Sequence, residues 1–173
     1  ESTLTSEYQI LNANTPLEPF KVFQPRTRGL EYDIAHYEDY FYILTNKDGA
    51  TNFKLMRTPE SVTTSEHWEE VIAYRPEVRL NDIEIFKDFL VVEEVYNGLE
   101  HIQIRSWDGS KAHYLPFNSE TYTAYPTQNI DFNTEWLRYN YQSLATPASI
   151  VEYNMRTGEE RLLKEQEVLG GNF

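Results

Sequence analysis

The amino-acid sequence predicts an all-β protein, and three observations support this prediction. Tyr and Phe, which favour strands, supply most of an aromatic fraction of 14%. Short apolar runs alternate with turn signals, and no long stretch has helical periodicity. One pattern also returns at intervals of nearly fifty residues. A chain of 173 residues that is 40% hydrophobic is about the size of one domain with a substantial core.

The repeat is visible in three segments, "DYFYILTNKDGATNFKLMRT", "KDFLVVEEVYNGLEHIQIRSWDG" and "TEWLRYNYQSLATPASIVEYNMRTG". Their leading aromatic residues are spaced by 48 and 47 positions, and these residues are Phe41, Phe89 and Trp136. Two pairs of turn glycines are each 49 positions apart, and these pairs are Gly49 with Gly98 and Gly109 with Gly158. Such a period is typical of a structural repeat.

Each repeat is predicted to be a four-stranded antiparallel meander. "YFYIL" and "FLVV" are short continuous apolar runs, as expected for strands buried on both faces. The following strand alternates instead, with Ile102 and Ile104 separated by Gln103. Hairpin signals stand between the strands, because Asn-Gly and Asp-Gly tolerate the positive φ of tight turns. These signals are Asn97-Gly98, Asp108-Gly109 and Thr157-Gly158.

The stretch "TTSEHWEEVIAY", residues 63–74, has two interpretations. It resembles a capped helix, with Ser65 as N-cap and Glu69 and Glu70 in the first turn. The repeat favours a strand, because Trp68 to Ile72 stands where a fourth strand belongs, as "PFKVF" and "AHYLPF" do in neighbouring units. We therefore expect a strand.

Four-stranded units of 40–50 residues are typical of β-propeller blades. The sequence predicts a partial β-propeller with about three four-stranded antiparallel blades, at residues 29–74, 79–117 and 124–165. Residues 4–24 are expected to be the outer strands of a preceding blade, whose inner strands would precede residue 1. Complete propellers have about four to eight blades. We therefore expect exposed blade faces and self-association through them.

Charge and composition limit the classes of binding partner and the cellular locations that the sequence allows. A net charge of −13 argues against nucleic acid or an anionic membrane surface as the partner. Solvated surface charge explains the acidic balance without a ligand. No apolar run approaches the ~20 residues that span a bilayer. The absence of Cys is compatible with a cytoplasmic location. Because residue 1 is Glu, an upstream signal and a periplasmic location stay open.

The sequence lacks the common motifs of hydrolase, phosphate-binding and metal-binding sites. No two glycines are four apart, so G-x-S-x-G is excluded, and no glycine-rich phosphate loop occurs. The four histidines lack H-E-x-x-H spacing, which predicts no metal site, and these are His36, His67, His101 and His113. Adjacent carboxylates in a strand point to opposite faces, and these pairs are Glu69-Glu70, Glu93-Glu94 and Glu159-Glu160. We expect no catalytic residue and no cofactor in this chain.

The last repeat, "YQSLATPASIVEYNMRTGEERLLKEQEVLG", resembles the final propeller blade of the prolyl oligopeptidase family of serine peptidases. An aromatic residue, a serine and a proline come there in the same order before a strand that ends in a Thr-Gly turn. "FQPRTRGLEYDIAHYEDYFYILTNKDGATNFKLMRT" and "FLVVEEVYNGLEHIQI" look like the oligopeptidase B (protease II) branch. The resemblance spans roughly residues 17–171.

The resemblance implies a parent with a seven-bladed propeller seated on an α/β-hydrolase domain that carries a Ser-Asp-His triad. The propeller of such enzymes admits oligopeptides and excludes folded proteins, and oligopeptidase B cleaves after Arg or Lys. The catalytic domain would begin just beyond the segment matching "KEQEVLGG", where this chain ends at Phe173. The triad has no counterpart here, so no catalytic residue is carried over.

The hairpin from Tyr141 to Pro147 is expected to face that catalytic domain in cis, with Arg138, Tyr141 and Ser143 as candidate interdomain contacts. Packing within the blade explains these three residues equally well. The acidic propeller would attract basic oligopeptides as substrates. Two other functions stay open at this point. One is a non-enzymatic propeller that binds peptides or proteins, and the other is a dipeptidyl or proline-specific peptidase.

Overall fold

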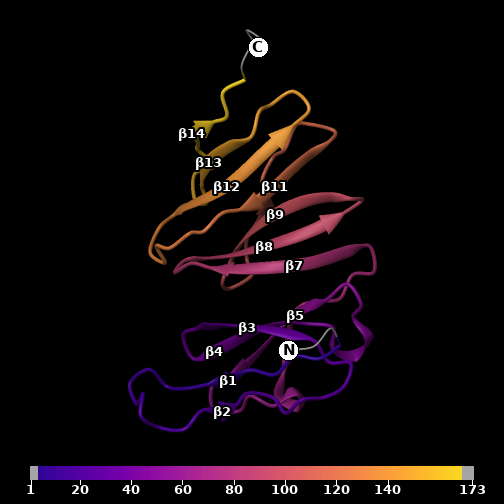
Figure 1. Ribbon diagram of the computed structural model, residues 1–173, viewed down its shortest axis with the longest axis vertical. Coiled ribbons are helices and arrows are strands. Elements are labelled where there is room, and N and C mark those ends of the chain that lie inside the picture. The colour runs from indigo at the N-terminus through magenta and orange to yellow at the C-terminus, as the bar shows by residue number, and fades with distance from the viewer. Residues whose placement is uncertain (1–3, 169–173) are drawn as a thin grey trace. The chain divides into compact units, whose positions relative to one another are not determined.

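The computed structural model describes residues 4–168, which form β-sheets joined by turns and two short 3₁₀ helices (Figure 1). The strands make three four-stranded antiparallel sheets and one two-stranded sheet. The predicted all-β class, with four-stranded antiparallel units, is confirmed. No helix in the part of the chain described is long and apolar enough to cross a membrane. The chain divides into two compact units, residues 1–80 and 81–173, and each is described by itself.

The first unit contains a two-stranded and a four-stranded sheet. The small sheet pairs β1 (Gln9–Ile10) with β2 (Lys21–Val22). The larger sheet has its strands in sequence order, and these are β3 (Tyr32–Tyr37), β4 (Tyr40–Thr45), β5 (Lys54–Pro59) and β6 (Glu69–Ile72). Short 3₁₀ helices precede β5 and β6, and these are η1 (Lys47–Gly49) and η2 (Ser65–His67).

Aromatic side chains dominate the core of the first unit. Phe23, Tyr32 and Trp68 are buried together, with ring centroids 5.4–6.3 Å apart. Their polar atoms are satisfied by backbone carbonyls: the Tyr32 hydroxyl donates to Gln24 O at 3.2 Å, and Trp68 Nε1 donates to Thr63 O at 2.8 Å. This core ties residues 4–24 to the four-stranded sheet.

The stretch 63–74 contains both a helical turn and a strand. Ser65–His67 forms the 3₁₀ helix η2, after which Glu69–Ile72 pairs with β5. The predicted fourth strand is confirmed, and it begins after Trp68. The rejected helical signal reflects a real but single turn. Thr64 rather than Ser65 is its N-cap, without a side-chain capping bond.

The second unit contains two four-stranded sheets. One consists of β7 (Val78–Ile85), β8 (Phe89–Tyr96), β9 (Leu99–Ser106) and β10 (Ala112–Tyr114). The other consists of β11 (Tyr122–Pro126), β12 (Trp136–Ser143), β13 (Ser149–Asn154) and β14 (Glu160–Glu165). The predicted units starting at residues 79 and 124 begin one and two positions after these first strands.

The core of the second unit lies between its two sheets. Val91, Ile102 and Ile104 from one sheet pack with Leu137 and Tyr153 from the other. Figure 1 shows β9 beside β11, which brings the two sheets face to face. Gln103 and Leu90 point to the other face and are buried too. Side chains on both faces of β8 and β9 are therefore buried, although the sequence of β9 alternates between apolar and polar residues.

The predicted hairpin turns are present. Asn97 and Gly98 join β8 to β9 with φ values of 51° and 78°, so both residues adopt the left-handed conformation of a tight hairpin. Asp108-Gly109 lies between β9 and β10, and Thr157-Gly158 lies between β13 and β14. These turns fix the register in which the flanking strands pair.

The outer strand pairs of the first and third four-stranded sheets share an irregularity. Register shifts occur between Leu55 and Met56 where β5 pairs with β6, and between Ile150 and Val151 where β13 pairs with β14. Such β-bulges increase the local twist and bend the strand that carries the additional residue.

Candidate functional site

Residues 4–168 contain no group of three or more His, Asp or Glu side chains placed to hold a metal ion. Three other features bear on function: the predicted contact residues of the last sheet, a surface hollow, and a set of partly buried carboxylates.

Arg138 lies in β12 and is held within its own sheet. Its Nη2 donates to Glu152 Oε1 at 2.8 Å, and Glu152 is its direct partner on β13. Asn129 fixes the backbone of the same residue, because Arg138 N donates to Asn129 Oδ1 at 2.7 Å. About half of the Arg138 side chain stays exposed, so its outer edge is accessible.

Tyr141 and Ser143 lie at the other end of β12. The Tyr141 hydroxyl donates to Ser119 Oγ at 2.8 Å, and its ring stacks on Phe117 at 5.5 Å. Ser143 Oγ accepts the amide protons of Ala145 and Thr146, which shapes the turn before β13. Because Arg138 and Tyr141 are three positions apart on a strand, they belong to opposite faces. The structure thus does not unite the three predicted residues, and their interdomain role stays a prediction.

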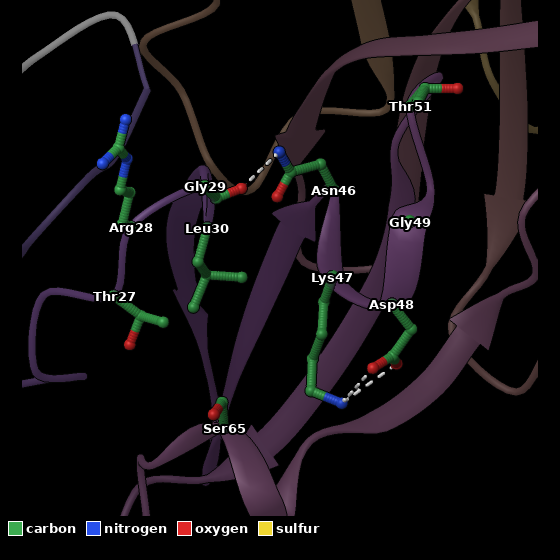
Figure 2. Close-up of a pocket in the computed structure, with 10 residues that line it drawn as sticks. All are labelled: Thr27, Arg28, Gly29, Leu30, Asn46, Lys47, Asp48, Gly49, Thr51 and Ser65. Atoms are coloured by element: carbon green, nitrogen blue, oxygen red, sulfur yellow. Dashed lines mark hydrogen bonds and ion pairs between the residues drawn. The ribbon is translucent and has the colours of Figure 1, made fainter.

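A hollow of about 380 Å³ opens on the surface of the first unit (Figure 2). The turn between β4 and β5 forms one side and residues 27–30 form the other. Asn46 links the two sides, since its Nδ2 donates to Gly29 O at 3.0 Å and its Oδ1 accepts the Glu31 amide at 2.9 Å. In Figure 2, Arg28 lies well apart from the paired Lys47 and Asp48.

The charge in this hollow is largely neutralised from within. Lys47 Nζ lies 3.0 Å and Lys54 Nζ 3.2 Å from Asp48 Oδ2. Hydrogen bonds from Lys47 and then Lys54 hold the pKa of Asp48 below its usual value. Thr27 and Ser65 contribute hydroxyls, but no histidine lines the hollow to activate them. The geometry suits contact with another polar surface rather than bond-making chemistry.

A set of carboxylates in the second unit was not predicted as a group. Burial, followed by the charges of Asp82, Glu84 and Glu100, raises the pKa of Glu93 to about 7. Burial also raises the pKa of Glu84 to about 7, against the opposing effect of Asn129 hydrogen bonds. The adjacent Glu94 points to the opposite face of β8, where it accepts the Tyr114 hydroxyl at 2.8 Å. Glu93 and Glu94 therefore belong to opposite faces of β8, as expected for adjacent residues of a strand.

The sequence held a weak signal for this set. Asp82 and Glu84 occupy alternate positions of "NDIEI", and therefore belong to one face of β7. Nothing in the sequence indicated that Glu93 and Glu100 would join them, because that depends on how β7, β8 and β9 pair.

The fold and these surfaces define a class: a segment of a β-propeller that offers contact surfaces and, within residues 4–168, no metal centre. A family model described as "Prolyl oligopeptidase, N-terminal beta-propeller domain" matches residues 1–166. The chain therefore belongs to the prolyl oligopeptidase family, as part of its propeller domain, which confirms the resemblance drawn from the sequence.

Two relatives match nearly the whole chain. The dipeptidyl aminopeptidase BI of Pseudoxanthomonas mexicana is 40% identical over 170 residues, covering 98% of this chain and 23% of that protein. The protease 2 of Moraxella lacunata is 32% identical over 169 residues, covering 98% of this chain and 24% of that protein. The chain thus spans about a quarter of the length of these relatives.

Solved structures place the fold in the same branch. Oligopeptidase B from Trypanosoma brucei, in a closed form with covalently bound antipain, matches all of this chain and 26% of its own, with a TM-score of 0.92 and 26% identity. Oligopeptidase B from Leishmania major matches 99% of this chain and 25% of its own, with a TM-score of 0.88. Its 24% identity supports the fold alone. The propeller segment is oligopeptidase B-like.

Proposed function

We propose that this chain is the gating segment of a serine peptidase that hydrolyses short peptides after Arg or Lys. The main support for this proposal is the structural match of the whole chain to oligopeptidase B from Trypanosoma brucei, with a TM-score of 0.92. The two sheets of the second unit pack around a close-packed core, and a stiff wall of this kind admits flexible peptides while it excludes folded proteins. This segment restricts access, and an α/β-hydrolase domain in cis supplies the Ser-Asp-His chemistry.

The preference for basic peptides has a physical rationale in the charge of the segment. A net charge of −13 creates a negative potential that concentrates cationic peptides and raises their association rate. The cleavage preference itself follows from the resemblance to the oligopeptidase B branch.

A second candidate is a dipeptidyl aminopeptidase, which removes two residues from a free N-terminus. The 40% identity to a dipeptidyl aminopeptidase BI over 98% of the chain favours it. The two candidates share the gating role of the propeller. They differ in whether the substrate must carry a free amino terminus two residues before the scissile bond.

The first test is to sequence the parent gene downstream of the codon for Phe173. A G-x-S-x-G after a strand, followed in order by Asp and His, would support the peptidase. A stop codon, or a domain without that motif, would instead leave a binding propeller.

The second test assays the parent enzyme on Arg, Lys and Pro reporter peptides, each with a blocked or a free N-terminus. Cleavage of blocked Arg and Lys reporters supports the endopeptidase, and cleavage only of free dipeptidyl reporters supports the second candidate.

The steering effect predicts a dependence on ionic strength. We expect kcat/KM of the parent enzyme on an Arg reporter to fall severalfold when the NaCl concentration of the assay is raised from about 0.02 M to about 0.5 M. Salt screens the attraction between the acidic propeller and the basic peptide. A reporter of equal length with a neutral residue in place of Arg is the matched control. If both reporters lose activity equally, the charge of the propeller has no steering role.

A further inference from the structure

The loop that joins β8 to β9 consists of two residues, Asn97 and Gly98. β8 ends at Tyr96 and β9 begins at Leu99, and these two flanking residues pair directly. Asn97 and Gly98 are both exposed to solvent. In the part of the chain that the structure describes, no hydrogen bond or ion pair engages the Asn97 side chain. The side-chain amide of Asn97 is therefore accessible to water at the tip of the hairpin.

Asn97 and Gly98 also carry the two groups that react in asparagine deamidation. The backbone nitrogen of Gly98, once hydroxide removes its proton, attacks Cγ of Asn97. The new N–Cγ bond closes a succinimide ring, and the Cγ–Nδ2 bond breaks, so that ammonia leaves with a proton from water. Water then opens the ring at either carbonyl and gives isoaspartate or aspartate. Gly98 favours the attack, because no Cβ shields its nitrogen and the space around its Cα is open.

The folded turn holds these two groups apart. Asn97 and Gly98 have φ values of 51° and 78°, as in a type I′ turn. In that turn ψ of the first central residue is about +30°, the mirror image of type I. This rotation directs the nitrogen of Gly98 away from the Asn97 side chain, whereas ring closure needs the two on the same side of the Cα–C bond. The hairpin tip must therefore open before the ring forms, and such local opening at an exposed loop tip costs less than global unfolding.

We propose that Asn97 is a site of spontaneous deamidation, gated by opening of the β8–β9 hairpin, and that its isoaspartate product prevents the hairpin from closing in the same register. The main chain of isoaspartate runs through the former side-chain carbons, so the loop gains one main-chain atom. A loop of two residues, with Tyr96 paired to Leu99, has no slack for this atom. The modification needs only water and hydroxide, and it does not depend on the proposed function.

The change in the loop reaches the core through the two strands that it joins. β8 and β9 are the inner strands of their sheet, and they carry Val91 and Ile104 into the core between the two sheets. A hairpin that no longer closes loosens the ends of both strands together. The aspartate product differs, because it keeps the normal main chain and aspartate tolerates the left-handed conformation. Both products add the same carboxylate, so the variant N97D separates the effect of charge from that of the lengthened loop.

The first measurement compares deamidation in the folded and the urea-unfolded 173-residue chain at one neutral pH. Peptide mapping by mass spectrometry follows Asn97 and, as the internal control, Asn118, which is exposed in an irregular loop and precedes Ser119. The ratio of the two rates cancels the effect of urea on the chemistry. We expect isoaspartate at Asn97 in both states, with the ratio of Asn97 to Asn118 about tenfold or more lower in the folded chain. The proposal is overturned if Asn97 stays intact in the folded chain, or if folding leaves the ratio unchanged.

Urea concentrations below the unfolding transition separate local opening from global unfolding. Opening of the hairpin tip exposes little surface, so the deamidation rate of Asn97 should stay nearly constant in this range. A rate that rises steeply, in parallel with the global unfolding constant, would contradict gating by the hairpin.

The last measurement tests the consequence for the fold. The acidic fraction of the aged chain is isolated by anion exchange, shown by mapping to carry isoaspartate at position 97 with Asn118 intact, and unfolded in urea beside N97D. We expect its unfolding constant to be about tenfold larger than that of N97D, which carries the same charge on a normal main chain. Unfolding curves that coincide would overturn the claim that the product disturbs the hairpin.

Discussion

At the scale of single residues, the conformations that matter most are those in the left-handed region. Four residues other than glycine have positive φ in the described part of the chain, and these are Glu38, Asp48, Phe53 and Asn97. Phe53 is the bulkiest and therefore carries the most unfavourable backbone at φ 62°. Packing of Arg79 over its ring at 5.9 Å provides a compensating contact. Asn97 is more ordinary, because its hairpin requires positive φ.

Asn97 gives a clean test of that requirement. We expect N97A to lower the free energy of unfolding by about 1 kcal/mol, because an alanine is strained in the left-handed conformation. N97G is the matched control and should stay within a few tenths of a kcal/mol of the wild type, since glycine adopts positive φ readily. Urea unfolding of the three chains measures the difference. Equal stability of N97A and N97G would mean that the turn is not held at positive φ.

At this scale, the sequence predicts turns well but does not predict the surroundings of the candidate site residues. Asn97-Gly98 was predicted because a dipeptide alone encodes the turn. Glu93 was predicted to point away from Glu94, which only requires that β8 is a strand. Its pKa is raised first by burial and then by the charges of Asp82, Glu84 and Glu100, and both causes depend on how the strands pack and pair. Arg138 and Tyr141 show the same limit, since their contacts with Glu152 and Ser119 are tertiary.

At the scale of strands, burial on both faces explains why the inner elements were predicted well. Continuous apolar runs such as "FLVV" need two apolar neighbours, and the core of the second unit supplies one on the β11–β14 side. Hydrophobic pattern alone did not reveal that Gln103 in β9 is buried as well. It accepts Arg105 Nη1 at 3.0 Å, so a polar residue at an apparently exposed position is satisfied locally. The helical signal of residues 63–74 was rejected because the repeat favours a strand, whereas the structure contains the single turn η2 followed by the strand.

Truncation of β12 should test the inter-sheet core. Leu137 is fully buried, so we expect L137A to lower the free energy of unfolding by about 2–5 kcal/mol through lost burial and a residual cavity. L162A on β14 is the matched control, because Leu162 is 60% exposed. It should change stability by no more than about 0.5 kcal/mol. Chemical unfolding followed by circular dichroism measures both. Similar losses in the two variants would contradict the assignment of the core to the space between the sheets.

At the scale of the whole molecule, exposed apolar side chains and net charge have opposite effects on self-association. Several large apolar side chains are exposed in the described chain, and among them are Leu17, Ile130, Leu144 and Leu162. Such surface favours association. A charge of −13 opposes association, because copies of the chain repel one another over about a Debye length.

This opposition predicts salt-dependent self-association. We expect the weight-average mass in sedimentation equilibrium to increase with protein concentration, and to increase more steeply when NaCl screens the repulsion. Replacing Leu162 and Leu163 on the edge strand β14 with lysine should reduce the effect, since exposed apolar edge strands are sites of association. N97G, which leaves the surface apolar area unchanged, serves as the control. A mass that stays that of one chain at every salt concentration would contradict the prediction.

The bulges of the outer strand pairs also bear on how the repeat is built. Leu55 and Ile150, where the two register shifts occur, are separated by 95 residues, as are the leading aromatics Phe41 and Trp136. The surrounding sequences, "KLMRTP" and "SIVEYN", have little in common. The irregularity therefore recurs at equivalent positions of the first and third four-stranded sheets, whereas β9 and β10 of the second pair without a register shift. For protein engineering, it marks a position in β6 and another in β14 where the ladder already accommodates an additional residue while the pairing of the inner strands is unchanged.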